Sequence, residues 1–297
     1  MNLRLGRMLA AGLLSLAGVA AATSRAHAQN SIVDAVQNYF ETWFDRVDEA
    51  QASQPHWMTP LITVTPRLEE ELRLDYLHES LPNGATLNNY INNKGLELIP
   101  TTTNEIILGI PSYEVRNGKG AAAGWGDYPY LLIKQRLLSA NEQDGNYILT
   151  FFLQGAAPTG IKAFSNNAYL INPTIAAGKG WGNFDIQATI GVQIPTSHAS
   201  TLGYPILTNV AFQYHIDRLF WPEFEVNYTY WPDGERGGIN QVMLTPGLII
   251  GRIPIYKRAR LIFGAGYQVA VTPPARSKAP LIPTYRSAPV VTARIAF

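Results

Sequence analysis

The stretch Phe184-Asp185-Ile186-Gln187-Ala188-Thr189-Ile190-Gly191-Val192-Gln193-Ile194 is apolar at every even position and polar or glycine at every odd position. This period of two is typical of a β-strand, whose successive side chains point to opposite faces. Strands of soluble proteins usually have about 5–6 residues, whereas about 9–11 tilted residues cross a bilayer. One face can therefore meet lipid. A strand survives in lipid only within a closed barrel, because open edges leave backbone groups unpaired.

The rest of the chain supplies similar strands, separated by turn residues. Together with the opening stretch, extended to 184–195, they predict an all-β fold, a 12-stranded antiparallel transmembrane β-barrel over residues 59–297 with an N-terminal amphipathic helix. A soluble β-sandwich is the alternative, but it does not need outward faces this apolar. The other predicted strands are 68–79, 87–99, 104–115, 125–137, 146–157, 167–178, 204–216, 221–231, 240–253, 258–272 and 284–297. The residues predicted to face lipid include Ile186, Ile190, Val192, Phe224, Tyr228 and Leu261.

Residues 1–28 have the features of a signal peptide, with Arg4 and Arg7 before an apolar core and Ala26-His27-Ala28 as the cleavage site. A membrane anchor is the alternative, but the apolar run is short. Export and a barrel together predict the outer membrane of a bacterial cell, with its lipids as partners. Loss of Arg4, Arg7 and Arg25 leaves 20 of the 23 basic residues against 22 acidic ones, which argues against nucleic acid as a partner.

The composition gives no sign of a cofactor or a metal. The chain has no cysteine, which excludes disulfides and thiolate sites. His215, on an inward strand position, has no second histidine at ligand spacing. We therefore expect no cofactor.

Residues 29–58 are predicted to form an amphipathic helix and a linker, placed in the periplasm or as a plug in the lumen. Apolar residues from Ser31 to Gln54 follow the helical period, and Pro55 ends the segment. Phe40, Trp43 and Phe44 lie on the apolar stripe and are the candidate plug residues. Packing of this helix at the barrel mouth is the alternative.

Charged and amide side chains at inward strand positions are the candidate lumen site. They either fill the interior with satisfied ion pairs or form a polar constriction that selects solutes. These residues are Glu69, Glu71, Arg73, Asp75, Lys134, Arg136, Asp185, Gln187, Glu223, Glu225, Arg260 and Arg294. Closure of the barrel is expected to bring Arg294 to the level of Glu69 and Glu71, and Arg260 to that of Glu225, as ion pairs.

Inward glycines predict free space in the lumen. They are Gly191, Gly247, Gly251, Gly264 and Gly266, and they lie beside the apolar Ile249 and Ile262 and the aromatic Trp231. Such a lumen suits small, weakly polar solutes better than sugars or ions. The sequence therefore favours a channel for small hydrophobic or aromatic compounds.

Several short motifs lie at strand ends and turns. They are Asp127, Lys134-Gln135-Arg136-Leu137, Pro158-Thr159-Gly160, Pro173, Gly180-Trp181-Gly182-Asn183-Phe184, Ile194-Pro195-Thr196 and Thr245-Pro246-Gly247-Leu248. Over residues 94–297 this pattern resembles the outer-membrane transporter family linked to the meta-pathway of phenol degradation. The resemblance implies a porin-like transmembrane transporter for the uptake of aromatic compounds.

Two other functions are kept as alternatives. His198 and Ser200 have the two-residue spacing of outer-membrane lipid hydrolases, but no third group that would orient the histidine is visible. A sealed, purely structural barrel is the other alternative. The last strand ends in Phe297, as in bacterial outer-membrane barrels, which predicts recognition by the barrel-assembly machinery.

Overall fold

The computed structural model describes residues 33–273 and 284–297, so the predicted signal peptide 1–28 lies outside the described residues. The chain divides into two units, Met1–Arg46 and Val47–Phe297, which are considered separately. Residues 33–41 are helical, and α2 (Trp43–Ala52) continues after a turn at Thr42, as the apolar period predicts. None of the described helices is long and apolar enough to cross a membrane.

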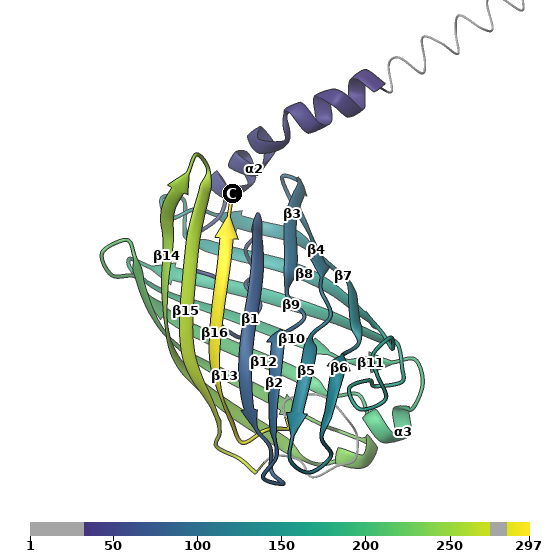
Figure 1. Ribbon diagram of the computed structural model, residues 1–297. Helices are drawn as coiled ribbons and strands as arrows, with labels where there is room; N and C mark the ends of the chain where they lie inside the picture. Colours follow the sequence, from purple (N-terminus) through teal and green to yellow (C-terminus); the bar gives the residue numbers. More distant parts are fainter. Residues whose placement is uncertain (1–32, 274–283) are drawn as a thin grey trace, which may run out of the picture. The chain divides into compact units, whose positions relative to one another are not determined.

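In the second unit a single antiparallel sheet closes on itself, because β16 pairs with β1 (Figure 1). The described strand segments form the predicted barrel of twelve strands, because four of these strands are each divided into two segments. In chain order the twelve are β1 (Glu71–Ser80), β2 (Thr86–Ile91) with β3 (Gly95–Thr101), β4 (Asn104–Gly109) with β5 (Tyr113–Asn117), β6 (Ala122–Trp125) with β7 (Tyr128–Ala140), β8 (Tyr147–Ala157), β9 (Leu170–Trp181), β10 (Phe184–Val192) with β11 (Ile194–Pro195), β12 (Ile206–Tyr214), β13 (Phe220–Tyr230), β14 (Asn240–Tyr256), β15 (Ala259–Ala270) and β16 (Ser287–Ala296).

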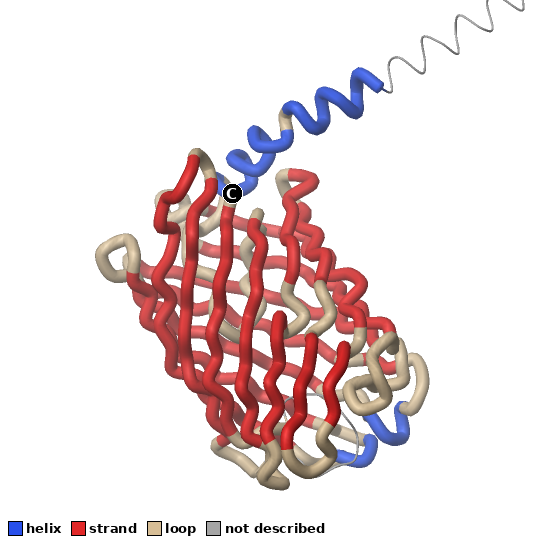
Figure 2. The backbone as a smooth tube through the Cα atoms, viewed as in Figure 1, coloured by secondary structure: helices blue, strands red, loops and turns tan. Residues whose placement is uncertain are grey.

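Barrels of this kind carry short turns at the periplasmic end and longer loops at the outer end. The end at which β1 begins and β16 finishes is therefore the periplasmic end of this barrel. The short elements α3 (Ala199–Leu202) and η1 (Gly234–Arg236) lie in loops at the outer end (Figure 2).

The alternation along β10 has the predicted orientation. The Ile190 side chain is 55% exposed on the outer face, whereas Asp185 and Gln187 are 1% and 0% exposed inside the barrel. The same alternation continues in β13, where Phe224 is exposed and Glu223 and Glu225 are buried. The apolar residues thus form the outer face and the polar ones fill the lumen.

Three neighbouring strands are interrupted at similar positions. From the last residue of β2 onward, Ile91, Asn92 and Asn93 have φ of 78°, 52° and 56°. Left-handed backbone is unusual for a β-branched residue and more readily adopted by asparagine. Asn93 Oδ1 accepts a hydrogen bond from the backbone N–H of Ser112, between β4 and β5, at 3.1 Å. These interruptions break the period of two, which explains why the alternation is weak in this part of the sequence.

Candidate functional site

An extended segment fills part of the lumen. Residues 55–70, here called the lumen segment, connect α2 to β1 and contain neither helix nor strand. All of its residues except His56, Ile62 and Val64 are buried. Pro60 and Pro66 lack the N–H that regular structure needs, so the backbone polar groups of the segment must find partners on the barrel wall.

Inward carboxylates bind the N–H groups of this segment. Leu61 N donates to Glu223 Oε1 at 3.0 Å. Ile62 N and Thr63 N donate to the two oxygens of Glu225 at 2.8 and 2.6 Å. Hydrogen bonds to a charged acceptor contribute about 1.5–3 kcal/mol each. The carboxylates of β13 therefore hold the middle of the lumen segment.

Inward cations bind its carbonyl groups. Arg294 donates through Nη1 to Thr59 O at 2.7 Å and through Nη2 to Pro60 O at 3.0 Å. Lys134 Nζ donates to Arg67 O at 3.0 Å. Side chains on opposite sides of the lumen therefore bind the backbone of the lumen segment.

Apolar packing adds to these bonds. Trp57, Met58 and Leu61 form a buried cluster with wall residues that include Ile249 and Ile262. A Cβ at Gly247, Gly264 or Gly266 would lie 2.5, 2.8 or 2.6 Å from a methyl carbon of Leu61, and one at Gly251 would lie 2.6 Å from Met58 Cε. These glycines do leave space on the wall, but the lumen segment occupies it.

Most of the predicted lumen residues are buried and bonded inside the barrel. Arg73 pairs with Asp75 at 2.8 Å, and Lys134 pairs with Glu105 at 2.8 Å. Asp185 Oδ1 accepts a hydrogen bond from Gln187 at 3.1 Å, and Glu69 pairs with Arg67 at 2.7 Å. Glu71 is 1% exposed, and Arg136 donates to Ala50 O and Thr102 O. The constriction role of these residues stays a prediction.

Two expected ion pairs are not formed among the described residues. Arg294 lies opposite Arg73 in the register of β1 and β16, and its guanidinium donates to carbonyls of the lumen segment instead of pairing with Glu69 or Glu71. Arg260 is exposed near the periplasmic start of β15, while the Glu225 carboxylate is taken by Ile62 and Thr63. The expectation failed because it did not include the lumen segment.

Arg252 contacts the lumen segment, which the sequence analysis did not predict. It has φ of 60° at a register shift between β14 and β15, where a β-bulge changes the direction of the side chain. Its guanidinium donates to His56 O at 2.7 Å and to Trp57 O at 2.8 Å. Strict alternation assigns an outward direction to residue 252, so the period of two alone could not find this contact.

Two exposed contacts lie in the same region at the periplasmic rim, one an ion pair and the other between a histidine and a carboxylate. Asp48 on α2 pairs with Arg258 at 2.6 Å, and this hydrogen bond lowers the pKa of the Asp48 carboxyl. His56 Nδ1 lies 2.9 Å from Glu142 Oε2, and His56 N donates to Oε1 of the same carboxylate at 2.6 Å. Partial burial raises the pKa of Glu142, but the bonds from His56 outweigh it and leave the pKa below its usual value.

The candidate plug residues of the helix belong to the first unit. Within it the rings of Phe40 and Trp43 stack with centroids 6.4 Å apart, and Phe40 and Phe44 are 64% and 45% exposed. Their role as a plug stays a prediction. In the second unit, the lumen segment occupies part of the lumen.

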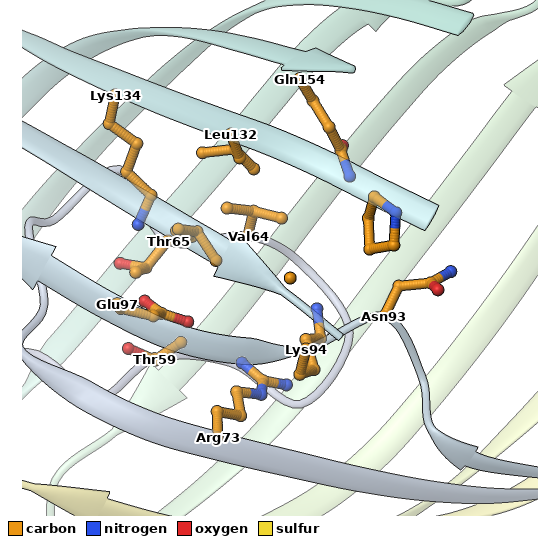
Figure 3. A pocket seen from close by; sticks show the side chains of 13 residues that line it. Thr59, Val64, Thr65, Arg73, Asn93, Lys94, Glu97, Leu132, Lys134 and Gln154 are labelled. Atoms are coloured by element: carbon orange, nitrogen blue, oxygen red, sulfur yellow. The ribbon is translucent and has the colours of Figure 1, made fainter. Parts of the chain in front are cut away.

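The described residues enclose an outer and an inner cavity in the lumen. The outer cavity has a volume of about 420 Å³, and its wall includes Ile62, Leu77, Leu87, Asn89, Glu114 and Gln154. The inner cavity has only about 50 Å³ and lies against Val64 and Thr65 of the lumen segment. Figure 3 shows Arg73, Lys94 and Lys134 around this inner space with Glu97. Asn93, Pro129 and Gln154 border both cavities, so the lumen narrows sharply next to Val64 and Thr65 of the lumen segment.

The motif residues at the outer rim bond to each other. Asp127 Oδ1 accepts the N–H of Gly160 at 3.1 Å, and its Oδ2 accepts the N–H of Asn166 at 2.8 Å. Asp127 thereby shapes the loop that follows β8. These two positions of the family-like pattern have a structural role.

The geometry of His198 and Ser200 does not support the hydrolase alternative. His198 and Ser200 are both exposed around the start of α3. In the described chain no hydrogen bond joins their side chains, and His198 contributes its carbonyl oxygen to the N–H groups of Thr201 and Leu202. A serine nucleophile needs a base within hydrogen-bond reach, which this arrangement does not provide.

Comparisons with known proteins support the fold. No protein-family model and no curated protein matches the chain. An outer membrane channel from Pseudomonas putida F1 is similar with a TM-score of 0.52 and 12% identity, over 76% of this chain and 93% of that one. A NanC porin has a TM-score of 0.46 and 9% identity, over 76% and 98% of the two chains. Outer membrane phospholipase A from Escherichia coli has a TM-score of 0.38 and 13% identity, over 84% and 96%. The chain thus has the fold of an outer-membrane β-barrel.

Proposed function

We propose that this chain is a channel of the bacterial outer membrane for small hydrophobic or aromatic compounds. The observation that carries the proposal is the outer cavity of about 420 Å³. Its wall combines apolar side chains such as Leu77 and Leu87 with amides such as Asn89 and Gln154. Cavities lined by apolar groups with a few polar ones are typical sites for small organic ligands.

Passage beyond this cavity requires the lumen segment to move. An apolar cavity of about 150 Å³ holds benzene, whereas the inner cavity has about 50 Å³. The segment is held by side-chain hydrogen bonds to its backbone, which can be exchanged for water one at a time. The channel is therefore gated by residues 55–70 and is not a permanently open porin.

Two further observations favour this function. The motifs around Pro158-Thr159-Gly160 and Thr245-Pro246-Gly247-Leu248 resemble a transporter family linked to phenol degradation. The Pseudomonas putida protein with a similar fold is described as an outer membrane channel. The first observation favours the uptake of small aromatic compounds, and the second favours only a channel in the outer membrane.

Uptake into liposomes tests the proposal. Labelled aromatic compounds and a disaccharide are offered to liposomes with the full-length protein, with a version lacking residues 31–54, or without protein. We expect the aromatic compounds to enter protein-containing liposomes faster than empty ones, and the disaccharide to show little gain. Equal aromatic permeability in all three preparations would refute the channel.

A sealed structural barrel is the second candidate, because residues 55–70 fill the inner lumen. It predicts no uptake, even after the bonds between Glu225 and the lumen segment are removed. The channel predicts that the same change increases uptake. The uptake of this variant therefore distinguishes the two candidates.

A further inference from the structure

Two carboxylates, Glu79 and Glu114, line the outer cavity together with the amide of Asn89. Strand register places Leu77 of β1, Asn89 of β2 and Glu114 of β5 in one row across adjacent strands. Glu79 of β1 lies in the next row, opposite Leu87. All five residues line the cavity, so their side chains reach the same space.

Two acceptors of this group, the Glu114 carboxylate and Asn89 Oδ1, have no hydrogen-bond partner in the described chain, whereas the Glu79 carboxylate has a side-chain hydrogen bond with Asn89. Glu114 is 7% exposed, and no hydrogen bond or ion pair from a described residue reaches its carboxylate. Asn89 Oδ1 is buried and has no hydrogen-bond partner. Glu79, 8% exposed, adds a second carboxylate to the same wall. Arg116 attracts both carboxylates but forms an ion pair with neither among the described residues, and buried carboxylates without a paired cation are costly.

The nearby cation is directed elsewhere. Arg116, the only Lys or Arg among the described residues that line this cavity, donates through Nη2 to Ala163 O at 3.3 Å. Its guanidinium carbon lies 5.0 Å from the centre of the Phe164 ring. The third acidic group, Asp127, is occupied by Gly160 and Asn166. The remaining acceptors therefore suit a positively charged donor from outside the chain.

We propose that the outer cavity binds the ammonium group of a small amphiphilic amine. An ammonium group has three donors and no acceptor, which matches Glu114, Asn89 Oδ1 and Glu79. The apolar body of the ligand lies against Leu77 and Leu87. This inference rests on the proposed function, and it adds a charged class, small amphiphilic amines, to the weakly polar compounds that the lumen composition favours.

Binding measurements on the full-length protein in detergent test this site without requiring transport. Isothermal titration calorimetry at pH 7 compares three probes with the same phenyl body, namely 2-phenylethylamine, 2-phenylethanol and 3-phenylpropanoate. We expect the amine to bind about 10-fold more tightly than the alcohol, as one charge-assisted hydrogen bond provides, and the acid to bind most weakly. Equal affinities for amine and alcohol would overturn the proposal.

The variant Glu114→Gln removes the charge and keeps the side-chain shape. It is expected to lower amine affinity about 10-fold and to leave alcohol affinity unchanged, while Asp144→Asn, an exposed change in a periplasmic turn, alters neither. Unchanged amine affinity in a folded Glu114→Gln protein would also overturn the site. If that variant does not fold, the three probes on the unaltered protein still decide. Amine binding without liposome uptake refutes the channel alone, and uptake without amine preference refutes this site alone.

Discussion

Arg294 donates through Nη1 to the carbonyl oxygen of Thr59 at 2.7 Å, across 235 positions of the sequence. The first residue lies on the strand that closes the barrel, and the second lies in the segment that precedes the barrel's first strand. Closure of the wall and docking of the lumen segment are therefore coupled. The lumen segment is therefore an integral part of the folded barrel.

The Glu225 carboxylate is expected to control how often the lumen segment leaves the wall. Glu225→Gln leaves one acceptor oxygen for Ile62 N and Thr63 N, which now share two. The loss should weaken docking by about 1–3 kcal/mol. With Thr63→Cys as a reporter in both proteins, maleimide labelling should become roughly 5- to 150-fold faster. Asp144→Asn is the control of equal charge change, and an unaltered labelling rate in Glu225→Gln would contradict the role of this carboxylate.

The close approach of Gly247 to Leu61 predicts a specific compensation. A Cβ at position 247 would lie 2.5 Å from Leu61 Cδ1. Gly247→Ala should destabilise the protein by about 1–3 kcal/mol through overpacking, and Leu61→Ala by about 2–5 kcal/mol through a cavity. The double variant should cost less than the sum, by about 0.5–3 kcal/mol. Denaturant unfolding measures all four proteins, and additive effects would mean that these residues do not touch.

The lipid-facing assignment is tested at Ile190, which is 55% exposed near the middle of the strand that β10 and β11 form together. Ile190→Arg is expected to destabilise the barrel by about 2–4 kcal/mol, because it places a charge in the bilayer. Ile190→Leu keeps the apolar surface and should change stability little. Reversible folding into lipid vesicles measures both. Similar stabilities for the two variants would show that residue 190 does not face lipid.

The rim contacts of Asp48 and Glu142 predict an acid-sensitive end of the lumen segment. The pKa values of Asp48 and Glu142 are lowered in the folded protein, so both carboxylates stabilise the fold above their unfolded pKa values of about 4. That contribution is lost as pH falls through the lowered folded values. Hydrogen exchange of residues 47–56, corrected for intrinsic rates, should be constant from about pH 5 to 8 and faster below about pH 4. Asp48→Asn with Glu142→Gln should remove this step. Its persistence would assign the acid sensitivity to other groups.

The sequence predicted the wall of this molecule well. The alternation correctly predicted that Ile190 faces outward and that Asp185 and Gln187 face inward, because a strand that separates lipid from a polar interior must keep a period of two. The number of transmembrane strands followed from the same pattern. The interruption at Ile91–Asn93 did not, since left-handed residues other than glycine leave no periodic signal.

The content of the lumen could not be predicted from that period. Residues 55–70 have no regular structure, and they depend on bonds to side chains more than 100 positions away, such as Glu225 and Arg294. One available signal was the set of inward glycines, which indicated space at one level of the wall. Their complement, Leu61, is visible only when the segment is placed inside the barrel.

The most direct test of the account locks the lumen segment to the wall and measures uptake. Asn227 Nδ2 lies 3.3 Å from Thr63 Oγ1, so Thr63→Cys with Asn227→Cys places two thiols close together in a chain without other cysteines. Uptake of a labelled aromatic compound into liposomes is compared in the oxidised and reduced forms of this variant. Each single-cysteine variant serves as a control. We predict that oxidation reduces uptake to the level of empty liposomes and that reduction restores it. Equal and substantial uptake in both forms would contradict gating by residues 55–70.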